Sequence, residues 1–328
     1  MSLLPVALTC GEPAGVGPEI TVKAWEVLRH GHPFFWIGDQ NHLRADTEIA
    51  LITHPSEAAS VFADALPVLH IPFDEARQSG KLRPTHAKDV IKSIEMAVSY
   101  TQNGEALAVC TNPINKKALK DGAGFAYPGH TEFLAALGQT KDVVMMLASP
   151  ELKVVPATIH IPLADVPFAL TADNLSNCIR VTHNALRSDF GIPKPRIAVA
   201  GLNPHAGEGG AMGLEDTSII SPVIASLISE GFDLVGPLPA DTMFHARARQ
   251  GYDAAVCMYH DQALIPIKTL DFDRGVNVTL GLPFVRTSPD HGTALDIAGK
   301  GNANPTSLIE ALKLANEMGA KRTGYGRI

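Results

Sequence analysis

The chain has 328 residues, a formal net charge of -7, 45% hydrophobic residues and 19% charged residues. This composition is typical of a globular protein. The negative charge argues against nucleic-acid binding, because affinity for a phosphate backbone comes from clustered Lys and Arg. No apolar stretch approaches the ~18 residues that cross a bilayer, and the four cysteines have no paired spacing. We therefore expect a cytoplasmic protein with free thiols that binds neither nucleic acid nor membranes.

Short apolar runs alternate with amphipathic segments along the whole chain. We expect strands at 5–9, 34–38, 66–71, 106–111, 143–147, 153–160, 196–200 and 254–259. We expect helices at 18–29, 87–102, 173–190, 216–230 and 306–318, and Thr171 is a candidate N-cap. This alternation predicts an α/β fold with a parallel or mixed sheet covered by helices. The length predicts two lobes, residues 1–127 plus 266–328 and an inserted lobe of residues 128–265.

The first expected strand runs into the turn GEPAGVGPEI, residues 11–20. Its glycines allow a ligand to approach the backbone, and a helix that starts at Pro18 and Glu19 offers N–H groups to an anion. A plain strand-to-helix turn is the alternative. The pattern matches neither GxGxxG nor GxxxxGK[ST], so it supports neither a dinucleotide fingerprint nor a P-loop.

Three histidines, His160, His205 and His260, each end or follow an apolar strand pattern. Ligand groups gather at strand ends in α/β sheets, and neutral imidazole is a common ligand for zinc and similar cations. Their wide spacing is no local metal signature, so core or surface roles remain open. Asp241 and Asp261 are candidates for orienting these groups or for proton transfer, with a turn or helix cap as the alternative.

Two further sets of side chains suit an anionic ligand. His130 and Thr131 open an expected helix, where a carboxylate or phosphate is favoured, although Thr131 could simply cap that helix. Lys268, Asn277 and Arg286 lie in apolar surroundings, where solvent-exposed roles are less natural for them. Arg offers a bidentate fork for phosphate or carboxylate, and Lys offers a point charge.

The segment HGTALDIAGKGNANP, residues 291–305, is rich in glycine. Gly292, Gly299 and Gly301 would allow close approach of the backbone to a ligand. Asp296 could accept hydrogen bonds from ribose hydroxyls, which favours NAD over NADP because the 2′-phosphate of NADP would be repelled. A glycine-rich surface loop is the alternative.

The ordered motifs GEPAGVGPEI, YPGHTEFL, HIPL, LNPHAGEGG, GPLPADTMF, MYHDQALIPIK and GVNVTLGLPFVRTSPDHGTALDIAGKG span residues 9–301. Together they resemble the 4-hydroxythreonine-4-phosphate dehydrogenase family of pyridoxal 5′-phosphate biosynthesis. The last segment also resembles the cofactor loop of isocitrate and isopropylmalate dehydrogenases. The resemblance implies the two-lobed α/β fold of that wider group, with mixed sheets flanked by helices and an active site in the cleft between lobes. It also implies a homodimer whose active sites are built from both chains.

The resemblance further implies roles for particular residues. A divalent metal (Zn, Mg or Co) would be held by His160, His205 and His260. The substrate would contact His130, Thr131, Lys268, Asn277 and Arg286, and Asp241, Asp261 and Lys268 would support catalysis. NAD, or NADP, would contact His291, Gly292, Thr293, Ala294, Asp296 and Asn304. Ala263 stands where many members have Gly, which affects only local backbone geometry.

The implied reaction is NAD-dependent oxidation of 4-phosphooxy-L-threonine at C3, followed by loss of CO2 to give 3-amino-2-oxopropyl phosphate. Other readings are a metal-dependent hydrolase, a phosphate acyltransferase and a non-catalytic anion-binding module. A hydrolase has no use for the glycine-rich loop, and an acyltransferase has none for the three histidines. A related dehydrogenase could instead act on another phosphorylated hydroxy acid or on a cis-dihydrodiol carboxylate.

Overall fold

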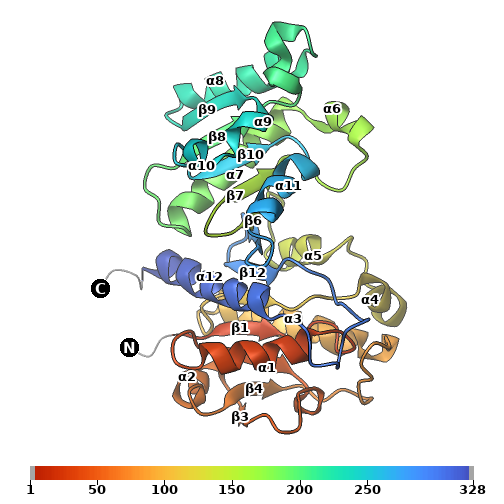
Figure 1. Cartoon of the computed structure of the whole chain (residues 1–328). Helices are drawn as coiled ribbons and strands as arrows, with labels where there is room; N and C mark the ends of the chain where they lie inside the picture. The colour runs from red at the N-terminus through yellow and green to blue at the C-terminus, as the bar shows by residue number, and fades with distance from the viewer. Residues whose placement is uncertain (1–3, 325–328) are drawn as a thin grey trace. The chain divides into compact units, whose positions relative to one another are not determined.

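The computed structural model describes residues 4–324, and the chain divides into two units (Figure 1). Unit 2 is Asp142–Gly281, and unit 1 holds the residues before and after it. These boundaries fall after residues 141 and 281, later than the 127 and 265 that we expected. The helix α5 (His130–Leu137) stays in unit 1 because it packs against α3 (Ala87–Gln102), and β11 (Val276–Leu280) stays in unit 2 because it pairs with β6 (Val144–Ala148).

Among the described residues, unit 1 contains six strands, and every pairing between two of them is parallel. In spatial order they are β3 (Ile49–Ile52), β4 (Leu66–His70), β2 (Phe34–Gly38), β1 (Val6–Thr9), β5 (Val109–Thr111) and β12 (Arg286–Pro289). The central strands β1, β2 and β5 are fully buried, and every residue of β2, FFWIG, is also apolar. A parallel strand covered on both faces has this continuous hydrophobic pattern.

The helices of unit 1 cover this sheet (Figure 1). They are α1 (Gly17–Leu28), α2 (Ala58–Val61), α3, α4 (Lys116–Ala123), α5 and α12 (Thr306–Thr323), with short 3-10 turns η1 (Gln40–His42), η2 (Pro55–Glu57) and η3 (Pro84–His86). α3 packs on β1, β2 and β5 through Val90, Ile94, Ala97 and Val98, the apolar face that its sequence predicted. α12 packs on β12 and also against α1.

Unit 2 has a mixed arrangement of six strands. In spatial order they are β11, β6, β7 (Lys153–Pro156), β10 (Ala254–Cys257), β8 (Arg196–Ala200) and β9 (Asp233–Leu238). β6 is antiparallel to both β11 and β7, and the other neighbours are parallel. The carboxyl ends of the parallel strands β7, β10 and β8 therefore lie at one edge, where the segments with His160, His260 and His205 begin.

The helices of unit 2 are α6 (Val166–Ala169), α7 (Ala172–Ser188), α8 (Ser221–Ser229), α9 (Ala240–Met243), α10 (Ala246–Arg249) and α11 (His260–Leu270), with 3-10 turns η4 (Leu163–Asp165) and η5 (Pro204–Gly210) and the π-turn η6 (Asp216–Ile220). Thr171 caps α7, because its side chain accepts a hydrogen bond from the Asn174 amide. α11 packs on β7 and β10 and begins with His260.

Several expectations about elements are confirmed, and others are wrong. The strand expected at 153–160 ends at Pro156, although the Ala157 and Thr158 amides still donate to the Cys257 and Met258 carbonyls at 2.7 and 3.2 Å. α11 was not expected, since Pro266 lies inside it.

All four cysteines are buried free thiols, as expected, and burial raises the pKa of Cys10 to about 12. No helix within residues 4–324 has the length and apolar character needed to cross a membrane.

Candidate active site

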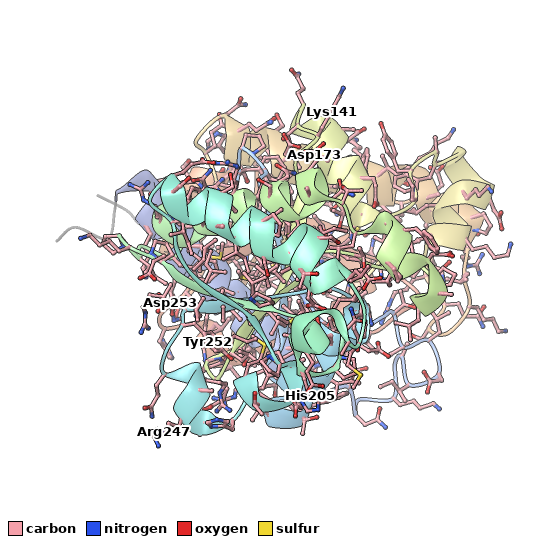
Figure 2. The ribbon with its side chains drawn as sticks, turned by 90° about the horizontal axis from the view of Figure 1, so that it is seen from above. Lys141, Asp173, His205, Arg247, Tyr252 and Asp253 are labelled. Atoms are coloured by element: carbon pink, nitrogen blue, oxygen red, sulfur yellow. The ribbon has the colours of Figure 1, made fainter. Side chains whose placement is uncertain are left out.

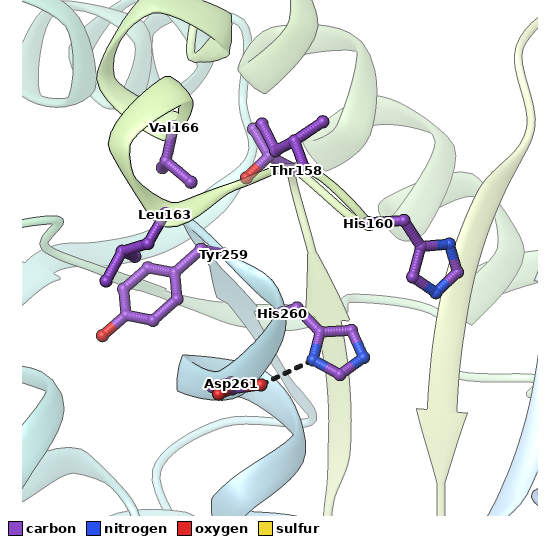
Figure 3. A pocket seen from close by; sticks show the side chains of 8 residues that line it. Thr158, His160, Leu163, Val166, Tyr259, His260 and Asp261 are labelled. Atoms are coloured by element: carbon purple, nitrogen blue, oxygen red, sulfur yellow. Dashed lines mark hydrogen bonds and ion pairs between the residues drawn. The ribbon is translucent and has the colours of Figure 1, made fainter.

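A pocket of about 300 Å³ in unit 2 lies beside His160 and His260 (Figure 3). The two imidazole centroids are 5.7 Å apart. Thr158 Oγ1 donates to the Met258 carbonyl at 2.7 Å, which ties the segment after β7 to the end of β10. The backbone φ of His160 is 54°, a left-handed conformation that is uncommon outside glycine and that clusters at functional sites.

Asp261 orients the ring of His260 (Figure 3). Nδ1 of His260 lies 2.7 Å from Oδ1 of Asp261. An ionised carboxylate can only accept, so Nδ1 carries the hydrogen, and the neutral ring keeps its lone pair on Nε2. This is the arrangement that metal-ligating histidines commonly use.

A second hollow, of about 340 Å³, shares His260 and Asp261 with the first. Its other lining residues come from α11, and they include Ile265 and Lys268. The ammonium of Lys268 lies 5.5 Å from the ring centroid of Phe272. The structure therefore brings together four predicted residues, His160, His260, Asp261 and Lys268.

His205 lies in a strained, glycine-rich loop in unit 2, and it is exposed (Figure 2). Residues 205–209 all have positive φ, and His205 itself has φ 53°. Asp216 holds the base of this loop: its carboxylate, fully buried, accepts from the Leu202 and Asn203 amides at 2.8 and 3.2 Å. Asn203 Nδ2 adds a third hydrogen bond at 2.9 Å.

Asp241 lies on the short helix α9, which packs against the His205 loop. Within residues 4–324, no three His, Cys, Asp or Glu side chains of one chain are close enough to share a metal ion. His160 and His260 therefore meet, while His205 does not join them in the single chain. The donor chemistry suits a divalent cation, but one chain brings together only two of the three imidazoles.

In unit 1, His130, the first residue of α5, lies near the positive charge of Arg286. Arg286 is 4% exposed, and its Nη2 donates to Thr111 Oγ1 at 2.7 Å. Burial lowers the pKa of Arg286 to about 10, so it stays charged at neutral pH. Burial also lowers the pKa of His130, helped by the charges of Arg286 and Lys116. Nε2 of His130 is shielded from solvent and has no hydrogen-bond partner within residues 4–324, although the residue as a whole is half-buried.

Lys116 is a third member of the set formed with His130 and Arg286. Nothing in the sequence around Lys116 predicted this position. It is the first residue of α4, after the N-cap Asn115, so its charge faces the positive end of the helix dipole. A Cβ added to Gly129 would lie 3.2 Å from its Nζ, which places the ammonium next to the start of α5. The neighbouring Lys117 pairs with Asp121, whereas the ion pairs formed within residues 4–324 include none to Lys116.

Thr131 lies on the expected helix α5, whereas Asn277 lies on β11, a strand that was not expected. Thr131 is half-buried in the first turn of α5, and the N-cap position there is Gly129, which makes no side-chain cap. Asn277 is half-buried in β11, opposite Leu147 of β6. Thr131 belongs to unit 1, and Asn277 belongs to unit 2.

The glycine-rich segment 291–304, called the cofactor loop below, lies against the turn of residues 11–17 in unit 1. The Val16 amide donates to the Thr293 carbonyl at 3.0 Å. A Cβ on Gly15 would come within 2.6 Å of that same carbonyl oxygen, so glycine is required for this contact. The turn thus supports the loop through its backbone, a use of its glycines that we did not predict.

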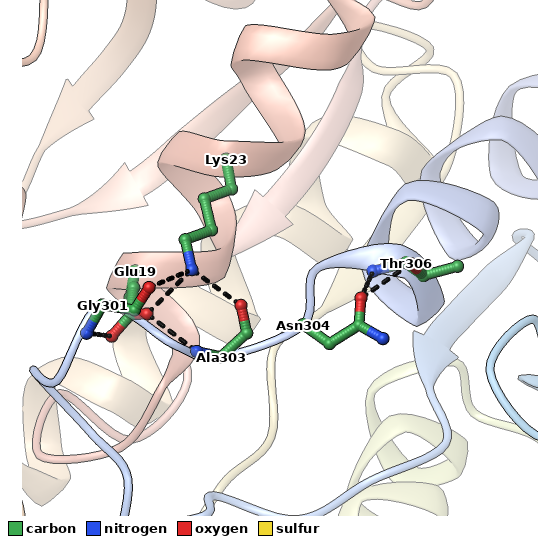
Figure 4. Close-up of polar contacts among 6 residues, drawn as sticks. All are labelled: Glu19, Lys23, Gly301, Ala303, Asn304 and Thr306. Carbon is green, nitrogen blue, oxygen red and sulfur yellow. Dashed lines mark hydrogen bonds and ion pairs between the residues drawn. The ribbon is translucent and has the colours of Figure 1, made fainter.

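The predicted cofactor residues all lie on this loop, and they differ in their exposure to solvent and in their backbone conformation. His291, Gly292 and Asp296 are exposed, and Thr293 is half-buried. Ala294 has φ 44°, another left-handed residue outside glycine. The side-chain oxygen of Asn304 accepts from the amide and hydroxyl of Thr306, the first residue of α12, at 3.0 and 2.7 Å (Figure 4).

The family model described as "Pyridoxal phosphate biosynthetic protein PdxA" matches residues 30–315. The 4-hydroxythreonine-4-phosphate dehydrogenase of Ruegeria sp. (strain TM1040) is 62% identical over 317 residues, which cover 97% of each chain.

Two solved structures are also similar. The 4-hydroxythreonine-4-phosphate dehydrogenase from Klebsiella pneumoniae has a TM-score of 0.87 at 39% identity, covering 96% of this chain and 99% of that one. A terephthalate 1,2-cis-dihydrodiol dehydrogenase from Burkholderia xenovorans LB400 has a TM-score of 0.68 at 28% identity, covering 96% and 98%. The expected α/β fold with a mixed sheet flanked by helices is confirmed. This chain belongs to the PdxA family of pyridoxal phosphate biosynthetic proteins.

Proposed function

We propose that this chain oxidises 4-phosphooxy-L-threonine at C3 with NAD and a divalent cation, and then releases CO2 to give 3-amino-2-oxopropyl phosphate. The observation that carries the proposal is the pairing of His160 with a His260 ring oriented by Asp261, in a chain 62% identical to a dehydrogenase of that name. The cation, when bound, supplies charge stabilisation on substrate oxygens, and NAD supplies a hydride acceptor.

The residues of the chain supply binding and orientation. Arg286 offers a buried guanidinium to the phosphate or carboxylate, and Lys116 adds charge beside it. His130, neutral because its pKa is lowered, can donate or accept through Nε2. Thr131 and Asn277 add neutral hydrogen-bonding groups. Lys268 brings a positive charge next to His260, where negative charge grows during oxidation and decarboxylation.

Proton transfer from the C3 hydroxyl needs a base, and Asp261 and Asp241 are the candidates. Asp261 is exposed, and its carboxylate is hydrogen-bonded to the His260 ring. It can therefore accept a proton through that imidazole. Asp241 adjoins the His205 loop. Asp261→Asn and Asp241→Asn distinguish the two, because loss of the base removes the fall in kcat at low pH that its protonation causes, while loss of an orienting group lowers kcat at all pH values.

We propose that the cofactor loop binds the adenosine part of NAD through His291, Gly292, Thr293, Ala294, Asp296 and Asn304. Asp296 is exposed, which leaves its carboxylate able to accept from ribose hydroxyls and favours NAD over NADP. The four buried thiols suit a reducing, cytoplasmic compartment.

We further propose a homodimer in which one metal site draws on both chains. Three imidazoles suit zinc, although magnesium or cobalt could serve, and no single chain groups three such ligands within residues 4–324. Apolar side chains around the unit 2 pocket are exposed: Leu163 is 68% exposed, Phe168 85% and Ile265 62%. A second copy covering them would remove this apolar surface from water.

Mixed variants test the shared site. His205→Ala and His260→Ala chains are prepared separately, each inactive, and then unfolded and refolded together. If these two ligands come from different chains, half of the dimers contain one intact site, and about a quarter of wild-type activity returns. No recovery, with dimers present, would show that each site uses one chain.

A substrate panel tests the reaction. NADH formation is followed with 4-phosphooxy-L-threonine, with another phosphorylated hydroxy acid and with terephthalate cis-dihydrodiol. The last is included because one structural relative is named for it. We expect turnover of the phosphothreonine to exceed the others by at least about a hundredfold in kcat/KM, because polar groups of the site that pair with its phosphate and its amino group are left unpaired by a ligand that lacks either one. Preference for either alternative would reassign the substrate within the same dehydrogenase class.

A further inference from the structure

The end of the cofactor loop runs along α1 with little support from its own backbone. Gly301 and Ala303 form no backbone-to-backbone hydrogen bond within the part of the chain that the structure describes. Gly301 has φ 75°, and the segment has no regular secondary structure. A glycine-rich segment of this kind is expected to sample many conformations unless side chains restrain it.

Lys23 of α1 restrains this segment (Figure 4). Its Nζ donates to the Gly301 carbonyl at 2.9 Å, to the Ala303 carbonyl at 2.7 Å and to Glu19 Oε1 at 3.0 Å. The three ammonium protons therefore have three acceptors, and the Lys23 side chain is only 24% exposed. A saturated, half-buried ammonium holds its acceptors in one geometry.

Glu19 completes the arrangement from the previous turn of the helix (Figure 4). Oε1 accepts from the Ala303 amide at 3.0 Å and Oε2 from the Gly301 amide at 3.4 Å. Burial alone would raise the pKa of Glu19, but the hydrogen bonds from Lys23 and from the two amides outweigh it and lower the pKa. The carboxylate is thus charged at neutral pH and bound to the loop.

Together, Glu19 and Lys23 engage the N–H and the C=O of both Gly301 and Ala303. A carboxylate near a helix start is often explained by the helix dipole alone. Here its oxygens are directed at a segment more than 280 residues away, with Asp296 just before it and Asn304 directly after it. The two side chains therefore provide the hydrogen bonds that Gly301 and Ala303 do not make with other backbone groups. They do so at the loop that we propose to bind the adenosine part of NAD.

We propose that Glu19 and Lys23 are positioning residues that hold the cofactor loop and thereby set the affinity for NAD. The inference rests on the proposed function, since the loop must bind NAD for its order to matter. A preorganised loop loses less conformational entropy on binding, so loosening it weakens NAD binding and leaves the chemical step unchanged.

The test uses Lys23→Met, which keeps the length of the side chain, and Lys23→Arg, which keeps the donors. NADH binding is measured by fluorescence without substrate, and hydrogen exchange is followed across residues 296–304. For Lys23→Met we expect faster exchange and a Kd raised about tenfold, with kcat at saturating NAD and the KM for substrate changed less than about twofold. Lys23→Arg should recover most of the affinity. Glu26→Gln is the matched control, because Glu26 is on the same helix but pairs with Arg44.

The outcomes separate this inference from the proposed function. Unchanged NADH affinity in Lys23→Met, whether or not its thermal stability falls, would overturn the positioning role and leave the dehydrogenase assignment intact. A drop in kcat as large as the loss of affinity would also overturn it, since that indicates a disturbed active site. Absence of NADH binding in the wild type would overturn both the proposed cofactor and this inference.

Discussion

Nδ1 of His260 and Oδ1 of Asp261, adjacent in sequence at the start of α11, lie 2.7 Å apart. This contact leaves Nε2 of His260 as the atom able to bind a cation, and it places the ring facing His160 at the edge of the unit 2 pocket. The sequence marks both residues, but only the fold brings His160 next to them, from the loop that follows a neighbouring parallel strand.

Asp261→Asn should weaken cation binding about ten- to hundredfold, the usual effect of losing a group that orients a metal-ligating histidine. The amide presents either an oxygen or an NH2 group to Nδ1, so the ring tautomer is no longer fixed. Titration with Zn or Co, followed by calorimetry, measures the change. Asp273→Asn serves as control, because Asp273 is exposed on the loop after α11. Equal affinity in Asp261→Asn and wild type would remove the orienting role.

Gly15→Ala should displace the cofactor loop, since the added Cβ would lie 2.6 Å from the Thr293 carbonyl oxygen. We expect the KM for NAD to rise at least about tenfold and the free energy of unfolding to fall by about 1–3 kcal/mol, as for other overpacked sites. Gly31→Ala is the matched control, because a Cβ there meets nothing within 4 Å. A normal KM for NAD in Gly15→Ala would show that the contact with Thr293 is not needed for cofactor binding.

Asp216→Asn should loosen the loop that carries His205. The carboxylate accepts three hydrogen bonds there, and an amide group leaves at least one buried donor without a partner, at a cost of about 1–3 kcal/mol. Chemical denaturation measures the stability, and cation titration measures the effect on His205. Glu208→Gln, exposed on the same loop, should change neither. Loss of stability with unchanged cation affinity would separate His205 from the metal site.

His42 should make the protein less stable in mild acid. Its ring is buried between Phe73 and His86, both ring nitrogens lack hydrogen-bond partners within residues 4–324, and burial lowers its pKa from 6.5 to about 4. Between these two pH values the unfolded chain binds a proton that the folded chain does not. The stability is therefore fully present above pH 6.5, and about 3 kcal/mol of it is lost as the pH falls toward 4.

Denaturant unfolding of the wild type and of His42→Leu across this pH range measures the effect. The variant should show a flatter dependence on pH, whatever its absolute stability, because the proton-binding difference is removed. His30→Leu, at an exposed position, should keep the wild-type slope. The same slope in His42→Leu would assign the acid sensitivity to other groups.

Much of the fold could be predicted because most strands of the parallel cores are short and rich in apolar residues. The segment 34–38 and the helix 87–102 were predicted to the residue. The strands β11 and β12 were missed because Asn277 and Arg286 were interpreted only as ligand-binding groups. α11 was missed because a proline inside a segment normally argues against a helix there.

The candidate site was predictable where chemistry is carried by unusual side chains at strand ends, as with His160 and His260. It was not predictable where the function of a residue depends on a contact distant in sequence. Glu19 and Lys23 form an ordinary i,i+4 pair in the sequence, and nothing local indicates that both bind residues 301–303. Lys116 resembles its neighbour Lys117 in sequence, and only the approach to Gly129 distinguishes them.

The most direct test of the central claim is the simultaneous measurement of NADH and CO2 released from 4-phosphooxy-L-threonine, before and after chelation. We predict equal amounts of the two products, loss of both after chelation, and recovery of both when a divalent cation is restored. NADH without CO2 would contradict the decarboxylating reaction. Turnover that is unaffected by complete removal of divalent cations would contradict the role assigned to His160, His205 and His260.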